Sequence, residues 1–89
     1  MKHRYLEITY RRGRAIAAYL YLPRQLGARS ARTEDVGHGL RVDYDASGAP
    51  MGIEVTAPGR ATIEDVNAVL EQLGAGALPD DEWAPLRAA

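Results

Sequence analysis

The sequence predicts an α+β fold: an antiparallel β-sheet of four to five strands, connected as a meander, is backed on one face by a C-terminal helix. Segments of alternating apolar and polar residues fill 1–57, which is typical of strands with one buried face. Apolar residues at helical spacing follow at 62–73, and a short helical or extended tail with the single tryptophan occupies 78–89. We expect one domain, 1–89, with a small core.

Composition excludes several classes of protein. There is no cysteine, so the chain has no disulfide framework, thiolate metal site or cysteine nucleophile. The sequence has no apolar run near the roughly 20 residues of a membrane helix, and it begins without the apolar segment of a signal peptide. We therefore expect a cytoplasmic protein.

The clearest strand pair is a hairpin within 39–57. Apolar residues alternate with polar ones in 40–44 and again in 53–57, and Ser47-Gly48-Ala49-Pro50 between them has turn chemistry. This hairpin should turn one apolar row inward and one charged row outward. The inward residues are expected to be Leu40, Val42, Tyr44, Ile53, Val55 and Ala57.

Two further strands are expected at 3–10 and 15–22, paired through the arginine-rich turn at 11–14. In the second strand Ile16, Ala18, Leu20 and Leu22 should face inward. Tyr19 and Tyr21 should face outward. Residues 30–36 are interpreted as a short, charged edge strand.

The helix at 62–73 has Thr62 as its expected N-cap and Gly74 just after its end. Its apolar stripe, which should cover the inward row of the sheet, is Ile63, Val66, Leu70 and Leu73. In the tail, Pro85 should end any helix after about one turn. The large apolar residues there, Leu78, Trp83 and Leu86, either close the end of the core or dock on a partner.

Part of the chain resembles a family of small bacterial proteins. Ala17-Ala18-Tyr19-Leu20-Tyr21-Leu22 is similar to its A-L-Y-I-x-L strand. Thr33-Glu34-Asp35-Val36, Gly39 to Asp45, Gly48 and Gly52-Ile53-Glu54-Val55 are similar to its second block, T-E-E-V…G-V-x-V-D-Y-D-x-x-G…G-I-E-I-L. The family is domain of unknown function 2283, and the likeness covers roughly residues 5–57.

The resemblance implies a small sheet-plus-helix bacterial protein with no assigned activity. By analogy with genes that neighbour small toxin-like genes, it also implies an antitoxin-like partner role. The family usually begins with Y-D-P-x-x-D-A-L-Y, whereas here Tyr10 is followed by the basic segment Arg11-Arg12-Gly13-Arg14. No role of that acidic loop is carried over.

Two groups of residues were considered for chemistry. His38 with Asp35 and Asp43 could hold a metal, but their spacing does not require one, and we predict no metal and no cofactor. Asp43, Asp45 and Glu54 could converge as a general acid and base. Exposed strand carboxylates more commonly pair with a cation on the next strand, here Arg41, and we predict no catalytic residue.

Charge is divided unevenly along the chain. Residues 1–44 hold nine Lys/Arg and four Asp/Glu, whereas residues 45–89 hold two and eight. Either the two halves attract each other, or the basic half contacts a nucleic acid. The arginines considered for nucleic acid are Arg4, Arg11, Arg12, Arg14, Arg24, Arg29, Arg32 and Arg41, set among Tyr5, Tyr19 and Tyr21.

The outward side of the sheet combines tyrosine and arginine in a polar field, a composition typical of interfaces. The sequence therefore predicts a non-enzymatic protein-interaction module, a homo-oligomer (a dimer) or the antitoxin-like partner of another small protein. The alternatives are a nucleic-acid-associated regulator and a small enzyme built on the three carboxylates. The predicted interface residues are Tyr19, Tyr21, Arg41, Glu54 and Trp83.

Overall fold

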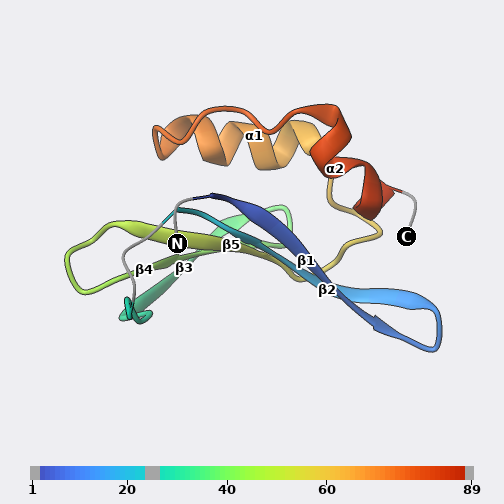
Figure 1. Ribbon diagram of the computed structural model, residues 1–89, viewed down its shortest axis with the longest axis horizontal. Helices are drawn as coiled ribbons and strands as arrows, with labels where there is room; N and C mark the ends of the chain where they lie inside the picture. The colour runs from blue at the N-terminus through green and yellow to red at the C-terminus, as the bar shows by residue number, and fades with distance from the viewer. Residues whose placement is uncertain (1–2, 24–26, 88–89) are drawn as a thin grey trace.

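Five strands form one antiparallel sheet, and two helices lie together on one of its faces (Figure 1). The computed structural model describes residues 3–23 and 27–87. The elements are β1 (Tyr5–Arg11), β2 (Arg14–Tyr21), β3 (Arg32–Gly37), β4 (Leu40–Tyr44), β5 (Pro50–Val55), α1 (Ile63–Gln72) and α2 (Asp80–Arg87). The predicted α+β class and the five-stranded antiparallel sheet are confirmed.

The strand order is β1-β2-β5-β4-β3, so the sheet consists of two meandering segments rather than one. After β2 the chain crosses to the far edge, and β3, β4 and β5 then return toward the centre, where β5 pairs with β2. Both ends of the crossing segment are bonded to the returning strands: Leu22 N donates to Met51 O at 3.0 Å and Ala31 N to Tyr44 O at 2.8 Å. Part of the crossing, residues 24–26, lies outside the described residues.

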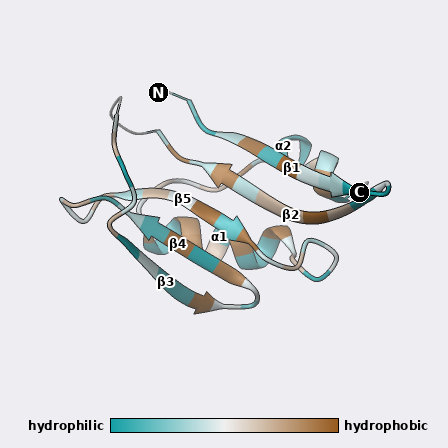
Figure 2. Cartoon of the chain, turned by 90° about the horizontal axis from the view of Figure 1, so that it is seen from below, coloured by the Kyte–Doolittle hydropathy of each residue, from teal (hydrophilic) through white to brown (hydrophobic). Residues whose placement is uncertain are grey.

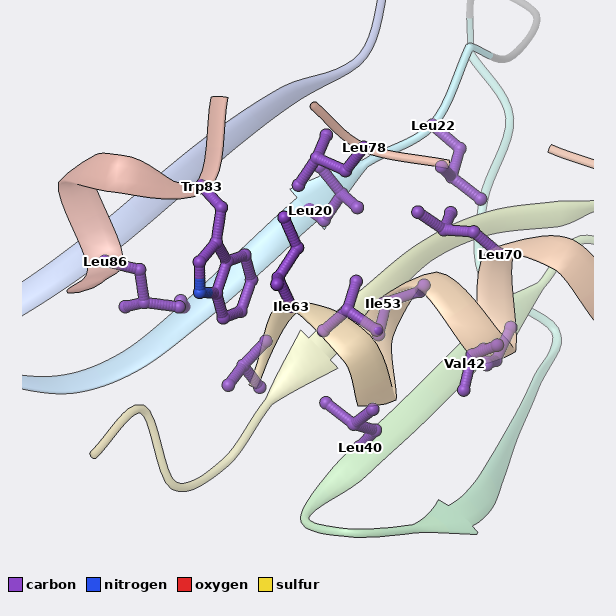
Figure 3. Packing of buried hydrophobic residues seen from close by; sticks show 14 residues of the cluster. Leu20, Leu22, Leu40, Val42, Ile53, Ile63, Leu70, Leu78, Trp83 and Leu86 are labelled. Carbon is purple, nitrogen blue, oxygen red and sulfur yellow. The ribbon is translucent and has the colours of Figure 1, made fainter. Parts of the chain in front are cut away.

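The core lies between the sheet and the helices, as the sequence predicts (Figure 3). Leu20, Val42 and Ile53 on the central strands are completely buried, as are Val66 and Leu70 of α1. Tyr44 and Leu73, both predicted to face inward, are partly buried against the same cluster. The inward row and the helical stripe therefore share one apolar interior.

Helix α1 begins and ends close to the predicted residues. The Thr62 hydroxyl accepts a hydrogen bond from the backbone N–H of Asp65 at 3.1 Å, as an N-cap should. Leu73 is the C-cap, and Gly74 follows it with a φ of 71°, the left-handed conformation that glycine adopts readily. Val69, which the predicted stripe omits, is also buried.

Two local predictions are wrong. Ile16 was expected to face inward, but it is 48% exposed, because β1 and β2 slip in register there: Thr9 pairs with Ala17 and Tyr10 with Ala15. This bulge leaves Ile16 without a partner and turns Ala15 toward the core in its place.

Pro85 does not end α2 after one turn, since the helix continues to Arg87. Pro85 removes one helical hydrogen bond and its ring crowds the carbonyl of Asp81, but Asp81 is exposed, so water can bond to that carbonyl instead.

The segment between α1 and α2 is fixed by two side chains. The Arg4 guanidinium donates to the carbonyls of Ala75, Gly76 and Ala77 at 3.1, 2.9 and 2.7 Å. The amide of Asn67 holds the backbone of Leu78 from the other side. These contacts direct Leu78, and after it Trp83 and Leu86, into the end of the core.

We predict that Arg4→Ala lowers the free energy of unfolding by about 2 kcal/mol, because three charge-assisted hydrogen bonds are lost together. Amide exchange should accelerate most in α2 and in residues 75–78. Arg60→Ala, at an exposed arginine whose side chain forms no hydrogen bond with the described residues, is the control and should change stability little. Equal effects of the two substitutions would contradict the anchoring role of Arg4.

Candidate interaction surface

Figure 2 shows the face of the sheet opposite the helices. Two rows of residues cross this face, and together we name them the outer face. Strand register aligns one residue from each strand in each row. The first row is Tyr5, Tyr21, Gly52, Asp43 and Thr33. The second row is Glu7, Tyr19, Glu54, Arg41 and Asp35. Neither helix covers these rows (Figure 1).

Three tyrosines on β1 and β2 pack against one another on the outer face. The rings of Tyr5 and Tyr21 stack with centroids 4.4 Å apart and planes 16° apart. Tyr19 and Tyr21 are tilted by 55° with centroids 4.6 Å apart. Because each ring is supported by the next, this aromatic group loses little conformational freedom if it is covered by a partner.

Tyr19 extends from β2 across β5 to β4. Its hydroxyl donates to Asp43 at 2.7 Å, and Thr33 of β3 donates to the same carboxylate at 2.6 Å. The ring can cross β5 only because Gly52 has no side chain, since a Cβ there would overlap Tyr19 ring atoms. One hydrogen-bonded chain therefore joins β2, β4 and β3 on the outer face.

The outer face is acidic, whereas the β1–β2 turn beside it is basic. The two rows contain four carboxylates, from Glu7, Asp35, Asp43 and Glu54, against one guanidinium. The turn, which lies at one end of the molecule (Figure 1), contains three exposed arginines and no acid. None of the three forms an ion pair with the described residues. We name residues 10–16, the turn with its flanking residues, the hairpin tip.

The three carboxylates considered for catalysis have separate roles. Asp43 accepts hydrogen bonds from Tyr19 and Thr33, and Glu54 lies opposite Arg41. Asp45 instead accepts from the hydroxyl and N–H of Ser47 at 2.6 and 2.9 Å and from the N–H of Ala49 at 3.0 Å. These bonds, that of the Ser47 hydroxyl first, hold the pKa of Asp45 below its ordinary value. Asp45 therefore shapes its own turn rather than joining the other two.

Trp83 was predicted to belong to the interface, and the structure corrects this. Its side chain is 3% exposed and lies in the core with Leu78 and Leu86, on the helix side of the sheet (Figure 3). Of the two roles considered, closing the end of the core is therefore the observed one. Tyr19, Tyr21, Arg41 and Glu54, the other predicted interface residues, all lie on the outer face.

His38 is separated from the carboxylates with which it was considered as a metal site. Its Nδ1 lies 3.7 Å from Asp65 of α1, while Asp43 is bonded to Tyr19 and Thr33. Among residues 3–23 and 27–87 no cluster of three or more metal-ligating side chains is found. In the same ranges no helix has the length and apolar character needed to cross a membrane.

Four of the ten residues in these rows are predicted interface residues, but the contacts that join them are not predicted from the sequence. Tyr5 enters the sequence analysis only among the aromatic residues considered for nucleic acid, and Gly52 only within the family resemblance. The pairing of β2 with β5 is what places Gly52 under Tyr19 and Asp43 within its reach. Alternation within a single strand does not predict this pairing. It shows which face of the sheet each side chain lies on, but not which strand lies beside it.

We predict that Gly52→Ala lowers the free energy of unfolding by about 1–3 kcal/mol, because the new methyl group displaces the Tyr19 ring. Tyr19→Ala removes the obstacle, so in that background the same glycine substitution should have a much smaller effect. Chemical denaturation of the four chains of this double-mutant cycle measures the coupling. Additive effects would show that the ring does not depend on Gly52.

We also predict that Ser47→Ala raises the pKa of Asp45 toward its ordinary value, because the first cause of the lowering is removed. Since a carboxylate with a lowered pKa stabilises the fold above its unfolded pKa, its contribution is lost as pH falls through the folded pKa. The variant should therefore show less loss of stability in acid than the wild-type chain. An NMR titration of the Asp45 carboxyl carbon, with Ser30→Ala as control, measures the shift; an unchanged pKa would contradict it.

Comparisons with known proteins give no relative for this fold and surface. The chain matches no protein-family model, no curated protein and no solved structure. The likeness to domain of unknown function 2283 stays a prediction.

Proposed function

We propose that this chain is a non-enzymatic protein-interaction module that associates with a second copy of itself through the outer face, and that it acts in the cytoplasm. The observation that carries the proposal is the packed group of three tyrosines on a sheet face that no described element covers. Tyrosine and arginine are enriched at protein interfaces, and preassembled rings reduce the entropy lost on binding. An antitoxin-like partner role, implied by the family resemblance, would use the same face.

Exposed apolar side chains gather on the β1–β2 hairpin, and one of them, Tyr5, lies in the rows of the outer face. Among residues 3–23 and 27–87 the exposed large hydrophobic residues are Tyr5, Tyr10 and Ile16, at 48%, 53% and 48% exposure. All three belong to β1 or β2. Exposed apolar area gathered on one hairpin is typical of a surface that is covered by another protein.

The nucleic-acid alternative has weaker support. A strand of phosphates laid on the tyrosines would meet four carboxylates and one guanidinium, which repel it on balance. Arg4 is bonded to the α1–α2 segment, and Arg32 pairs with Glu34 and stacks on Tyr44. Arg24 lies outside the described residues. The considered arginines therefore do not gather on one described surface, and the hairpin tip is the basic group that remains.

The enzyme alternative has weaker support still. Asp45 is bonded into its own turn, while Asp43 and Glu54 lie on the outer face with tyrosine and arginine neighbours. A general acid and base need to face one substrate from within hydrogen-bond reach. A hollow of about 310 Å³ lies beside the start of α1, on the helix side of the sheet, with Trp83 and Ile63 in its lining. None of the three carboxylates lines it.

The test is self-association measured by sedimentation velocity over a range of protein concentrations. Tyr5→Ser with Tyr21→Ser should weaken the dimer by about thirtyfold or more, as the loss of interface anchors does. Emission from the single tryptophan, Trp83, reports whether the core stays intact. The matched control is Glu71→Ser with Gln72→Ser, at exposed positions at the end of α1. A wild-type chain that stays monomeric throughout, or a tyrosine variant that associates normally, would overturn the proposal.

A further inference from the structure

The hairpin tip has three properties that the isolated fold does not use. Arg11, Arg12 and Arg14 are exposed, lie within four residues and form no ion pair with the described chain. The tip also contains Tyr10 and Ile16, two of the three exposed large hydrophobic residues found in the described ranges. Ile16 is exposed because of a bulge, a feature that commonly re-aims a side chain near a functional surface.

The backbone at the turn gives independent evidence. Arg12 has a φ of 53° and Gly13 a φ of 77°, so both central residues of the turn are left-handed. Turns of this kind strongly favour glycine or asparagine at the first central position. Glycine has no Cβ to crowd the following carbonyl, and the short amide of asparagine offsets the strain by bonding locally to the backbone. An arginine at that position adds a third positive charge at the expense of the fold's own stability. Strain of this sort gathers at functional sites.

The tip and the outer face are complementary in charge and lie at different levels along the same two strands. The turn is basic, whereas the rows that begin at Tyr5 and Glu7 are acidic and aromatic. Glu7 and Arg11 are four residues apart on β1, or about 13 Å along a strand. Consider a two-fold axis that lies in the plane of the outer face and runs perpendicular to the strands. Rotation about it turns a second copy face to face with the first and reverses its strand direction, so the turn of each copy lies over the Tyr5 and Glu7 end of the other.

We propose that two copies pair outer face to outer face about such an axis, so that the hairpin tip of each copy seats on the acidic, tyrosine-bearing rows of the other. Arginine suits this role because its guanidinium pairs with carboxylates and stacks on aromatic rings. The pairing is reciprocal, and each contact is made twice. This inference rests on the proposed function, for which it names the contacting elements.

A reciprocal charge exchange tests the proposal in the full chain. The tip variant has Arg11→Glu, Arg12→Glu and Arg14→Glu; the face variant has Glu7→Arg and Glu54→Arg. Each alone should associate at least about tenfold more weakly than wild type, because like charges meet across the axis. Mixed in equal amounts, they should form a heterodimer of near wild-type affinity. In that pair the unchanged tip of the face variant meets the unchanged face of the tip variant, and the other contact is restored with its charges exchanged. Restoration would also show that both variants fold.

The outcomes separate this inference from the function on which it rests. If the tyrosine variant loses the dimer while tip, face and mixture all associate like wild type, the outer face pairs in another arrangement and the inference is overturned. If the mixture fails to associate although both variants retain wild-type Trp83 emission, the inference is also overturned. If the tip variant keeps the dimer but loses salt-sensitive retention on single-stranded RNA, the tip serves nucleic acid instead. A monomeric wild type overturns the proposed function itself.

A single substitution tests the role of the strained arginine. Arg12→Asn relieves the left-handed strain, so we expect the melting temperature of the dilute chain to rise by about 4 °C. The same substitution should weaken self-association, because one guanidinium is lost from each contact. Arg60→Asn, at an exposed arginine outside the tip and the outer face, is the control and should change neither quantity. A more stable chain that associates as tightly as wild type would contradict a role for Arg12 in the dimer.

Discussion

The pairing of β2 with β5 is the interaction on which the rest of this structure depends. It joins the β1–β2 hairpin to the returning β3–β4–β5 segment, and without it the sheet would be two separate pieces. On the inner side the pair sets Leu20 beside Ile53, both completely buried under the helices. On the outer side it sets Tyr21 opposite Gly52, and the Tyr19 ring passes over this glycine to reach Asp43. One register therefore determines both the core and the outer face.

Much of the fold was predictable from the sequence because its signals are local. Alternation located the strands, Thr62 and Gly74 marked the limits of α1, and the helical stripe identified the buried face. Non-local features were not predictable in this way. The strand order depends on which edge the crossing segment reaches, and the exposure of Ile16 depends on a one-residue slip that alternation does not record. The continuation of α2 past Pro85 depends on the exposure of Asp81, whose carbonyl has no helical donor at Pro85.

The same division applies to the candidate surface. Four of its predicted residues lie on one face because side chains two apart on a strand point the same way. Trp83 was the exception, since a tryptophan in a terminal segment suits a core and an interface equally well by composition. Its position is decided by Arg4 and Asn67, which fix the preceding segment through backbone contacts. Contacts between residues more than seventy positions apart, such as those of Arg4, have no signature in a local pattern.

The uneven charge of the chain is only partly resolved within one molecule. Arg4 in the basic half lies 3.8 Å from Glu82 in the acidic half, and Arg87 is paired with Asp80 within α2. The arginines of the hairpin tip form no ion pair with residues 3–23 or 27–87, and they repel one another in a turn that strains one of them. A fold selected for the stability of a single copy gains nothing from this arrangement. Where a sequence departs from its local rules without an internal compensation, function is the usual reason. The tip is basic and the outer face is acidic, so pairing between two copies would compensate the charge of both.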